Sequence, residues 1–189
     1  MPVLQIVIAS TRPGRIGPVI ADWVRQRAEA HGGFDVEVVD LAEVDLPMFA
    51  EPNHPRLAQY EHEATQRWSA TVARADAFVF VMPEYNHSFN ASLKNALDHL
   101  FVEWGDKPVA FVSYGGPSGG LRAVAALKPV VASLRMVPVL EGVALPFVFA
   151  KISDGVFRSD DGADGAATAM LDEVFRLTEL YAPARRSGA

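Results

Sequence analysis

The stretch IVIASTRPGRIGPVIADWV, which runs from Ile6 to Val24, passes from an apolar strand pattern into an amphipathic helix pattern. Its strand part extends back to residue 3, and such a short apolar run is typical of a strand that is buried on both faces of a sheet. Its helix part repeats apolar side chains at helical spacing, namely Ile16, Val19, Ile20, Trp23 and Val24. A strand followed at once by a helix is the repeating unit of a parallel α/β fold.

The rest of the chain continues this alternation. Strand patterns are expected over residues 34–40, 77–82, 108–114 and 136–145, and helix patterns over about 57–68, 89–104, 121–134 and 170–181. The acidic, glycine-rich residues 153–165 are expected to form a surface loop. The alternation predicts one doubly wound domain over residues 1–182, with helices on both faces of a parallel sheet, followed by a flexible tail over residues 183–189.

Composition excludes several classes of function. The 189 residues carry a formal net charge of −6, which argues against general nucleic-acid binding. The chain has no cysteine, so disulfides, thiolate metal sites and dithiol redox chemistry are excluded, and any redox function needs a bound cofactor. No apolar run approaches the roughly 20 residues that span a bilayer, and the N-terminus lacks a secretion signal pattern. We therefore expect a cytoplasmic protein without a membrane partner.

In a doubly wound fold, ligands bind beyond the carboxyl ends of the strands, where three loops of this chain are unusual. The first loop, from Ser10 to Gly17, combines two hydroxyls with two arginines at the start of a helix. Arginines there oppose the helix dipole unless an anion lies between them, which favours a phosphate site over a simple capped turn. The loop matches neither GxxxxGK[ST] nor GxGxxG, so a nucleoside triphosphatase or dinucleotide site is not supported.

The second loop follows the strand pattern of residues 77–82 and begins with Pro83. The planar ring of Tyr85 stands between the carboxylate of Glu84 and the amide of Asn86, a combination that suits a flat heterocycle. A polar turn with Ser88 as a helix cap is an equally good interpretation from composition alone. His87 lies in the same loop, where a histidine more often has no contact with substrate.

The third loop, SYGGPSGG from Ser113 to Gly120, brings several glycines to a strand end, where backbone amides can approach a ligand. It also matches the GxSxG pattern of hydrolases around Ser118. In α/β-hydrolases the catalytic histidine follows the serine along the chain. All five histidines of this chain precede Ser118, which disfavours a hydrolase. His62 and Glu63 lack a second histidine at metal-ligand spacing, so no metal site is predicted.

Taken together in this order and spacing, ASTRPGRIGPVIADWV, PEYNHSFNASLKNALD and SYGGPSGGLRAV resemble the NADPH-dependent FMN reductase family. The resemblance covers residues 3–146. It implies a flavodoxin-like α/β three-layer sandwich with a five-stranded parallel sheet of order 2-1-3-4-5. It also implies non-covalent FMN, NADPH or NADH as the electron donor, and ping-pong transfer to a small acceptor such as a quinone, free flavin, azo dye or metal ion. The flavin then carries the chemistry, and no catalytic side chain is expected.

The resemblance also assigns residues to the cofactor. It implies that FMN contacts Ser10, Arg12, Arg15, Ile16 and Gly17 at its phosphate, Pro83, Glu84, Tyr85 and Asn86 along its ring, and Tyr114, Gly115 and Gly116 at the ring border. The sequence departs from the family pattern at Ala9, where many members have glycine, at Arg15, where some have serine, and at Asn90-Ala91, where Pro-Gly is common.

Two questions stay open from the sequence. The apolar residues of the helix predicted over 89–104 are either buried within one chain or packed against a second chain; with the resemblance added, we expect a homodimer or homotetramer. These residues are Leu93, Leu97, Leu100, Phe101 and Trp104.

The alternative functions are a flavodoxin-like electron carrier and a flavin-binding sensor without NAD(P)H turnover, although carriers usually have a TxTGxT-type loop and a strongly acidic surface.

Overall fold

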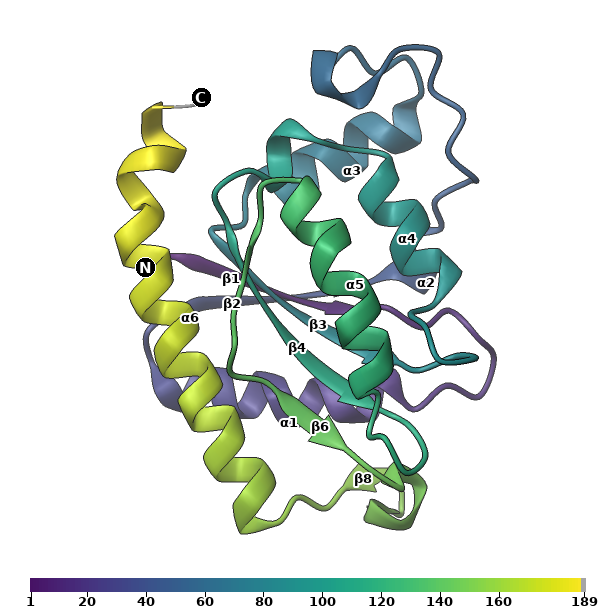
Figure 1. The fold of residues 1–189 in the computed structure, drawn as a ribbon, viewed down its shortest axis with the longest axis vertical. Helices are drawn as coiled ribbons and strands as arrows, with labels where there is room; N and C mark the ends of the chain where they lie inside the picture. The colour runs from purple at the N-terminus through teal and green to yellow at the C-terminus, as the bar shows by residue number, and fades with distance from the viewer. Residues whose placement is uncertain (188–189) are drawn as a thin grey trace.

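The computed structural model describes residues 1–187 and shows a parallel sheet with the order β2-β1-β3-β4-β5 (Figure 1). Its strands are β1 (Val3–Ile8), β2 (Asp35–Asp40), β3 (Ala77–Pro83), β4 (Pro108–Tyr114) and β5 (Val137–Pro138). This order confirms the expected flavodoxin-like fold. Every residue of β3 and β4 is buried, as their apolar sequences predict for the central strands of a sheet that is covered on both faces.

The last strand differs from its prediction. Instead of one strand over residues 136–145, β5 is followed by a separate strand, β6 (Val143–Leu145), and both pair with β4. The N–H of Val139 still donates to the carbonyl of Val109 at 2.9 Å, but the next residue, Leu140, leaves the sheet with 84% of its surface exposed. The chain rejoins β4 at Val143, which pairs with Val112.

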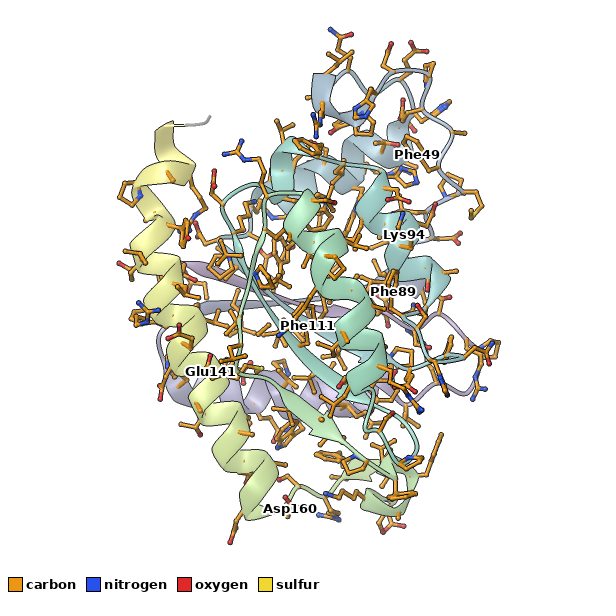
Figure 2. The ribbon with its side chains drawn as sticks, in the orientation of Figure 1. Phe49, Phe89, Lys94, Phe111, Glu141 and Asp160 are labelled. Atoms are coloured by element: carbon orange, nitrogen blue, oxygen red, sulfur yellow. The ribbon has the colours of Figure 1, made fainter. Side chains whose placement is uncertain are left out.

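Helices cover both faces of the sheet (Figure 1). On one face lie α1 (Gly17–His31) and α6 (Asp161–Ser187), and on the other lie α2 (Leu41–Val44), α3 (Glu63–Ala73), α4 (Ala91–Asp98) and α5 (Leu121–Ser133). Each face has its own hydrophobic core. In Figure 2, Phe111 lies between the sheet and α5, and its ring contacts the ring of Phe80 at a centroid distance of 6.3 Å.

The apolar residues between 89 and 104 are buried within the chain. Helix α4 ends at Asp98, where the His99 imidazole turns inward to Thr65 and to the carbonyl of Pro47, and a short 3-10 helix follows (Val102–Trp104). Four of the five apolar side chains are 1% exposed or less: Leu93, Leu97, Leu100 and Trp104. Of the two interpretations of this segment, burial within one chain is therefore correct, and the expectation of a homo-oligomer rests on the family resemblance alone.

Other boundaries also differ from the prediction. Helix α3 begins at Glu63, after a 3-10 helix (Pro55–Leu57), because the buried Glu51 carboxylate accepts hydrogen bonds from the N–H groups of residues 61 and 62 and holds them in a loop. The expected loop over 153–165 contains a small hairpin of β7 (Ile152–Ser153) and β8 (Val156–Phe157) and the first turn of α6. That turn is capped by Asp160, whose side chain accepts from the N–H of Ala163 at 2.8 Å.

Helix α6 also continues further than predicted. Residues 183–187, expected to belong to a flexible tail, are helical, and residues 188–189 of that tail lie outside the described part of the chain. Arg185 connects this end to the residue before β3, because its guanidinium pairs with Asp76 at 3.4 Å; it also donates to the carbonyl of Thr178 within α6 at 2.9 Å. Among residues 1–187, no helix is long and apolar enough to cross a membrane.

Candidate functional site

One cavity at the carboxyl ends of the parallel strands joins the three unusual loops. It has a volume of about 270 Å³. Its lining consists of Ser10, Arg12, Gly14, Arg15, Ile16, Pro83, Glu84, Tyr85, Tyr114, Gly115, Gly116, Val148 and Phe149. Of the residues that the resemblance assigns to FMN, only Gly17 and Asn86 do not line it. The fold therefore brings together residues as far apart in the sequence as Ser10 and Phe149.

The start of α1 has a free backbone donor. Its first turn has no side-chain cap and no acidic residue. Pro18 has no N–H, and the N–H groups of Val19 and Ile20 donate to the carbonyl of Ile16 at 3.1 and 3.2 Å, so the N–H of Gly17 is the donor of this turn that has no partner among residues 1–187. Beside it, the buried hydroxyl of Tyr114 has no hydrogen-bond partner among residues 1–187. A Cβ atom on Gly17 would lie 3.1 Å from this hydroxyl and 3.0 Å from Ile8, so glycine allows the helix start to pack closely here. Such a cradle suits an anion.

The two arginines of the first loop have different environments. Both terminal guanidinium nitrogens of Arg15 donate to Asp40, with Nη2 donating to Oδ2 at 2.7 Å, and Nη1 also donates to the carbonyl of Ser10 at 2.8 Å. The hydrogen bond with Asp40 raises the pKa of Arg15 above its ordinary value. Arg12 is exposed, and its side chain has no hydrogen bond or ion pair within the described chain. Arg12 is therefore available to an anion, whereas Arg15 braces the loop.

Asp40 is a functional residue that sequence reasoning missed. It ends β2 in register with Ile8 of β1, and it also caps α2 by accepting from the N–H of Ala42 at 3.0 Å. The sequence shows Asp40 as an acidic residue at the end of a strand pattern. Its partner, Arg15, follows only from the pairing of β1 with β2.

Tyr85 connects the second loop to the first. Its hydroxyl lies 2.8 Å from the buried hydroxyl of Ser10, and either group can donate. Tyr85 also begins a two-residue hairpin turn, in which Asn86 and His87 have φ values of 49° and 66° and residues 85 and 88 exchange two backbone hydrogen bonds. Both turn residues are exposed. Asn86 thus shapes the turn that presents Tyr85, and Ser88 is not the helix cap of the alternative interpretation, because α4 begins after Asn90.

Asn90 is a second residue that the sequence did not reveal as part of the site. Its side-chain amide donates to the carbonyl of Ala9 at 2.6 Å, and Ser92 Oγ donates to the same carbonyl at 2.9 Å. The start of α4 therefore holds the first loop in place. Asn90, which stands where the family pattern commonly has proline, therefore helps to position the first loop.

Glu84 is held as a charged group. Ser118 Oγ donates to its carboxylate at 2.7 Å, and Arg122 Nε donates to the other oxygen at 2.6 Å. Although burial disfavours the charged carboxylate, these hydrogen bonds outweigh burial and keep the pKa of Glu84 below its ordinary value. The negative charge is balanced within the protein. Among the described residues Ser118 has no histidine partner, so the hydrolase interpretation gains no support.

The third loop is compact because two of its glycines have left-handed backbones. A Cβ atom on Gly120, where φ is 88°, would lie 2.7 Å from the Cβ of Ser113. Ser113 Oγ in turn donates to the carbonyl of Gly119 at 2.8 Å. Gly115 and Gly116 are thereby kept at the cavity edge next to two residues that the sequence did not suggest, Val148 and Phe149.

Residues 1–150 match the family model described as NADPH-dependent FMN reductase. The chain belongs to this family. It is 42% identical over 149 residues to an NAD(P)H-dependent FMN reductase of Schizosaccharomyces pombe, which covers 77% of this chain and 74% of the relative. It is also 30% identical over 158 residues to an FMN-dependent NADPH-azoreductase of Staphylococcus saprophyticus, which covers 83% of this chain and 80% of that protein.

A solved structure agrees with the flavodoxin-like fold of this family member. The flavoenzyme NAD(P)H:(acceptor) oxidoreductase FerB from Paracoccus denitrificans superposes with a TM-score of 0.76 at 20% sequence identity. The match covers 96% of this chain and 99% of FerB. At this identity the likeness shows the fold alone.

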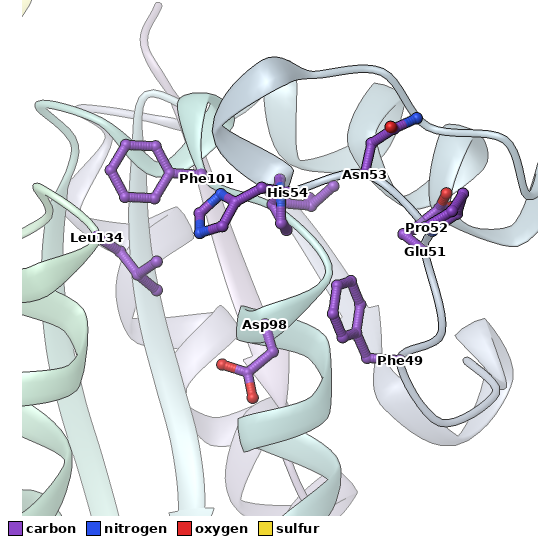
Figure 3. A pocket seen from close by; sticks show the side chains of 10 residues that line it. Phe49, Glu51, Pro52, Asn53, His54, Asp98, Phe101 and Leu134 are labelled. Carbon is purple, nitrogen blue, oxygen red and sulfur yellow. The ribbon is translucent and has the colours of Figure 1, made fainter.

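The family member has a larger cavity of about 520 Å³ between the 46–62 segment, α4 and α5 (Figure 3). Figure 3 shows Phe49, His54, Asp98 and Leu134 around it. The acidic side chains here already have partners: Asp98 pairs with Lys94 at 2.6 Å, and Glu51 accepts two backbone hydrogen bonds. Among residues 1–187, no cluster of three or more His, Asp and Glu side chains could hold a metal ion. The smaller cavity, with its unpaired donors, is therefore the better candidate site.

Proposed function

We propose that the protein is an FMN-dependent reductase that takes a hydride from NADPH or NADH and passes the electrons to a small acceptor. Membership of the NADPH-dependent FMN reductase family supports this activity. The observation that carries it at the level of residues is the anion cradle at one end of the 270 Å³ cavity. There the uncapped start of α1, the unpaired hydroxyl of Tyr114 and the free guanidinium of Arg12 come together.

The FMN phosphate is proposed to bind in this cradle. The N–H of Gly17 and the side chain of Arg12 would donate to it, and the dipole of α1 favours its negative charge. Arg15 positions the loop through Asp40 and Ser10, since its own charge is already balanced. Gly17 allows the close packing of the helix start, so its role is to shape the cradle.

The flavin ring is proposed to lie along Pro83, Glu84 and Tyr85 and beside Gly115 and Gly116, which line the rest of the cavity. When bound, FMN supplies the redox chemistry, because its ring accepts a hydride and returns the electrons to an acceptor. The protein binds and orients the ring. Glu84 is tied to Ser118 and Arg122, so it acts as a fixed charged group and is not placed to exchange protons during turnover.

Steady-state kinetics test this function. If donor and acceptor use the open face of the site in turn, plots of reciprocal rate against reciprocal NADPH concentration at several acceptor concentrations are parallel. Intersecting lines would show that both substrates bind together and would contradict the proposed alternation. Bound flavin that no nicotinamide donor reduces would favour the electron carrier or sensor.

The assembly and the compartment are part of the proposal as well. A homodimer or homotetramer and a cytoplasmic location are proposed from the family resemblance. Sedimentation equilibrium distinguishes these states from a monomer of 20.5 kDa.

A further inference from the structure

Two phenylalanines in one turn beside the cavity are largely exposed. Phe147 is 63% exposed and Phe149 is 67% exposed, whereas Val148 between them is fully buried. The buried valine anchors the turn in the core of the α1 and α6 face. Only one of the two exposed rings borders the cavity, because Phe149 belongs to its lining and Phe147 does not.

The backbone of this turn is strained and firmly held. Phe147 has a φ of 49°, in the left-handed region that a bulky side chain rarely adopts. Its N–H donates to the carbonyl of Gly116 at 3.1 Å, and the N–H of Val148 donates to the carbonyl of Gly115 at 3.5 Å. The glycine loop at the cavity edge therefore fixes the turn directly. Strain that is kept in place beside a binding cavity is typical of functional segments.

The far end of the turn is fixed too. The 3-10 helix that contains Phe149 (Val148–Lys151) leads into the β7–β8 hairpin, which lies beside β6 in Figure 1. The carbonyl of Lys151 accepts from the N–H of Arg158 at 2.7 Å, and the Lys151 side chain pairs with Asp160 at 2.7 Å. An exposed aromatic ring on a segment held at both ends can contact a ligand with little loss of conformational entropy.

We propose that Phe149 is the stacking surface for a flat, uncharged electron acceptor of the quinone class. This inference rests on the proposed function, since it assigns the acceptor side of the same cavity. A phenyl ring has no hydrogen-bonding group or charge, so it selects ligands by the apolar area and the aromatic face that they offer. It therefore favours a planar ring over an inorganic acceptor, which gains nothing from stacking.

The electron balance of the reaction fits this acceptor class. NADPH supplies a hydride, which is two electrons and one proton. The quinone takes up two electrons and two protons, with the second proton from water, and leaves as the hydroquinone. Ferricyanide instead takes up single electrons, so two ions are reduced for each NADPH, and it needs no stacking contact.

The test compares Phe149→Ala with Phe147→Ala, a control in the same turn with nearly the same exposure but outside the cavity. For Phe149→Ala we expect KM for the naphthoquinone menadione to rise about tenfold, the order of effect of one lost aromatic contact. KM for ferricyanide, which gains nothing from stacking, stays unchanged. Phe149→Trp, which keeps an aromatic face, retains a low KM for menadione.

Three results would overturn the inference: an unchanged KM for menadione in Phe149→Ala, an equal rise for ferricyanide, or the same rise in Phe147→Ala. Failure of the proposed function is seen separately, in the wild-type protein. If FMN binds but NADPH does not reduce it, the variants are compared after reduction with dithionite, by the concentration dependence of reoxidation by menadione. If the wild-type protein does not bind FMN, the proposed function fails first and the acceptor assignment falls with it.

Discussion

Arg15 and Asp40 form a two-pronged ion pair that joins the loop after β1 to the end of β2, with Nη2 and Oδ2 2.7 Å apart. Both side chains are mostly buried, at 19% and 11% exposure. The pair closes one side of the candidate FMN site. It also leaves Arg12 as the arginine of the first loop whose charge no described residue balances.

Removing the charge of Asp40 should therefore destabilise the protein. Asp40→Asn leaves Arg15 largely buried without its partner, and we expect the free energy of unfolding to fall by about 2 kcal/mol, the order of a lost hydrogen bond to a charged group. Urea unfolding measures this loss. Asp22→Asn is the control, because Asp22 pairs with Arg25 on the surface at 55% exposure, where a smaller effect is expected. Equal losses in the two variants would contradict the bracing role.

Arg12→Gln should weaken FMN binding without weakening the fold. Loss of a charge-assisted hydrogen bond to phosphate corresponds to a rise in Kd of about 10- to 100-fold. Fluorescence titration with FMN measures the change, and riboflavin, which lacks the phosphate, provides the matched control. A similar loss of riboflavin affinity would place Arg12 at the ring and would contradict the proposed phosphate contact.

Gly120→Ala should disrupt the third loop. The new Cβ atom would lie 2.7 Å from Ser113 Cβ and 2.8 Å from the backbone nitrogen of Tyr114, and φ is 88°. We expect a loss of stability of about 2–3 kcal/mol, measured by urea unfolding, together with weaker FMN binding. Gly165→Ala in α6 has no atom within 4 Å of the new Cβ and should be neutral or stabilising. Similar behaviour of the two variants would show that the glycine loop tolerates a side chain.

The free energy of unfolding should rise with pH between about 8 and 10 because of Lys107. The lower limit is its pKa in the folded protein, and the upper limit is close to the ordinary lysine pKa of ~10.4. Burial lowers the pKa of Lys107 to about 8, and its Nζ donates to the carbonyl of Val72 at 2.8 Å. Between the two pKa values the unfolded chain binds the proton that the folded chain has released, so raising the pH favours folding. Lys107→Met should flatten this rise in urea unfolding measured across the range, while Lys128→Met should preserve it. A rise that persists in Lys107→Met would assign it to another group.

Much of the fold follows from local sequence patterns. The apolar runs predicted for β3 and β4 differ from the observed strands by one residue at most, because a strand buried on both faces tolerates few polar side chains. Boundaries that depend on distant contacts were less predictable. Helix α3 begins directly after the residues whose N–H groups bind Glu51. Helix α6 begins earlier than its apolar pattern because Asp160 caps an acidic, glycine-rich segment.

The candidate site divides in the same way. The residue types of the three loops, together with the resemblance, indicated nearly every side chain that lines the cavity. They could not show that Arg15 is paired whereas Arg12 is free. The partner of Arg15 is Asp40, which is brought close only by the pairing of β1 with β2. Nor could they indicate Phe149, since nothing in its local pattern distinguishes an aromatic side chain at a cavity edge from one in the core.

The most direct test of the central claim is the visible absorption spectrum of the protein titrated with FMN and then, without oxygen, with NADPH. Our account predicts that the flavin bands shift as FMN binds and bleach when NADPH is added. FMN that leaves the spectrum of the mixture equal to the sum of its parts, with no bleaching by NADPH, would contradict both the phosphate cradle at the start of α1 and the proposed reductase activity.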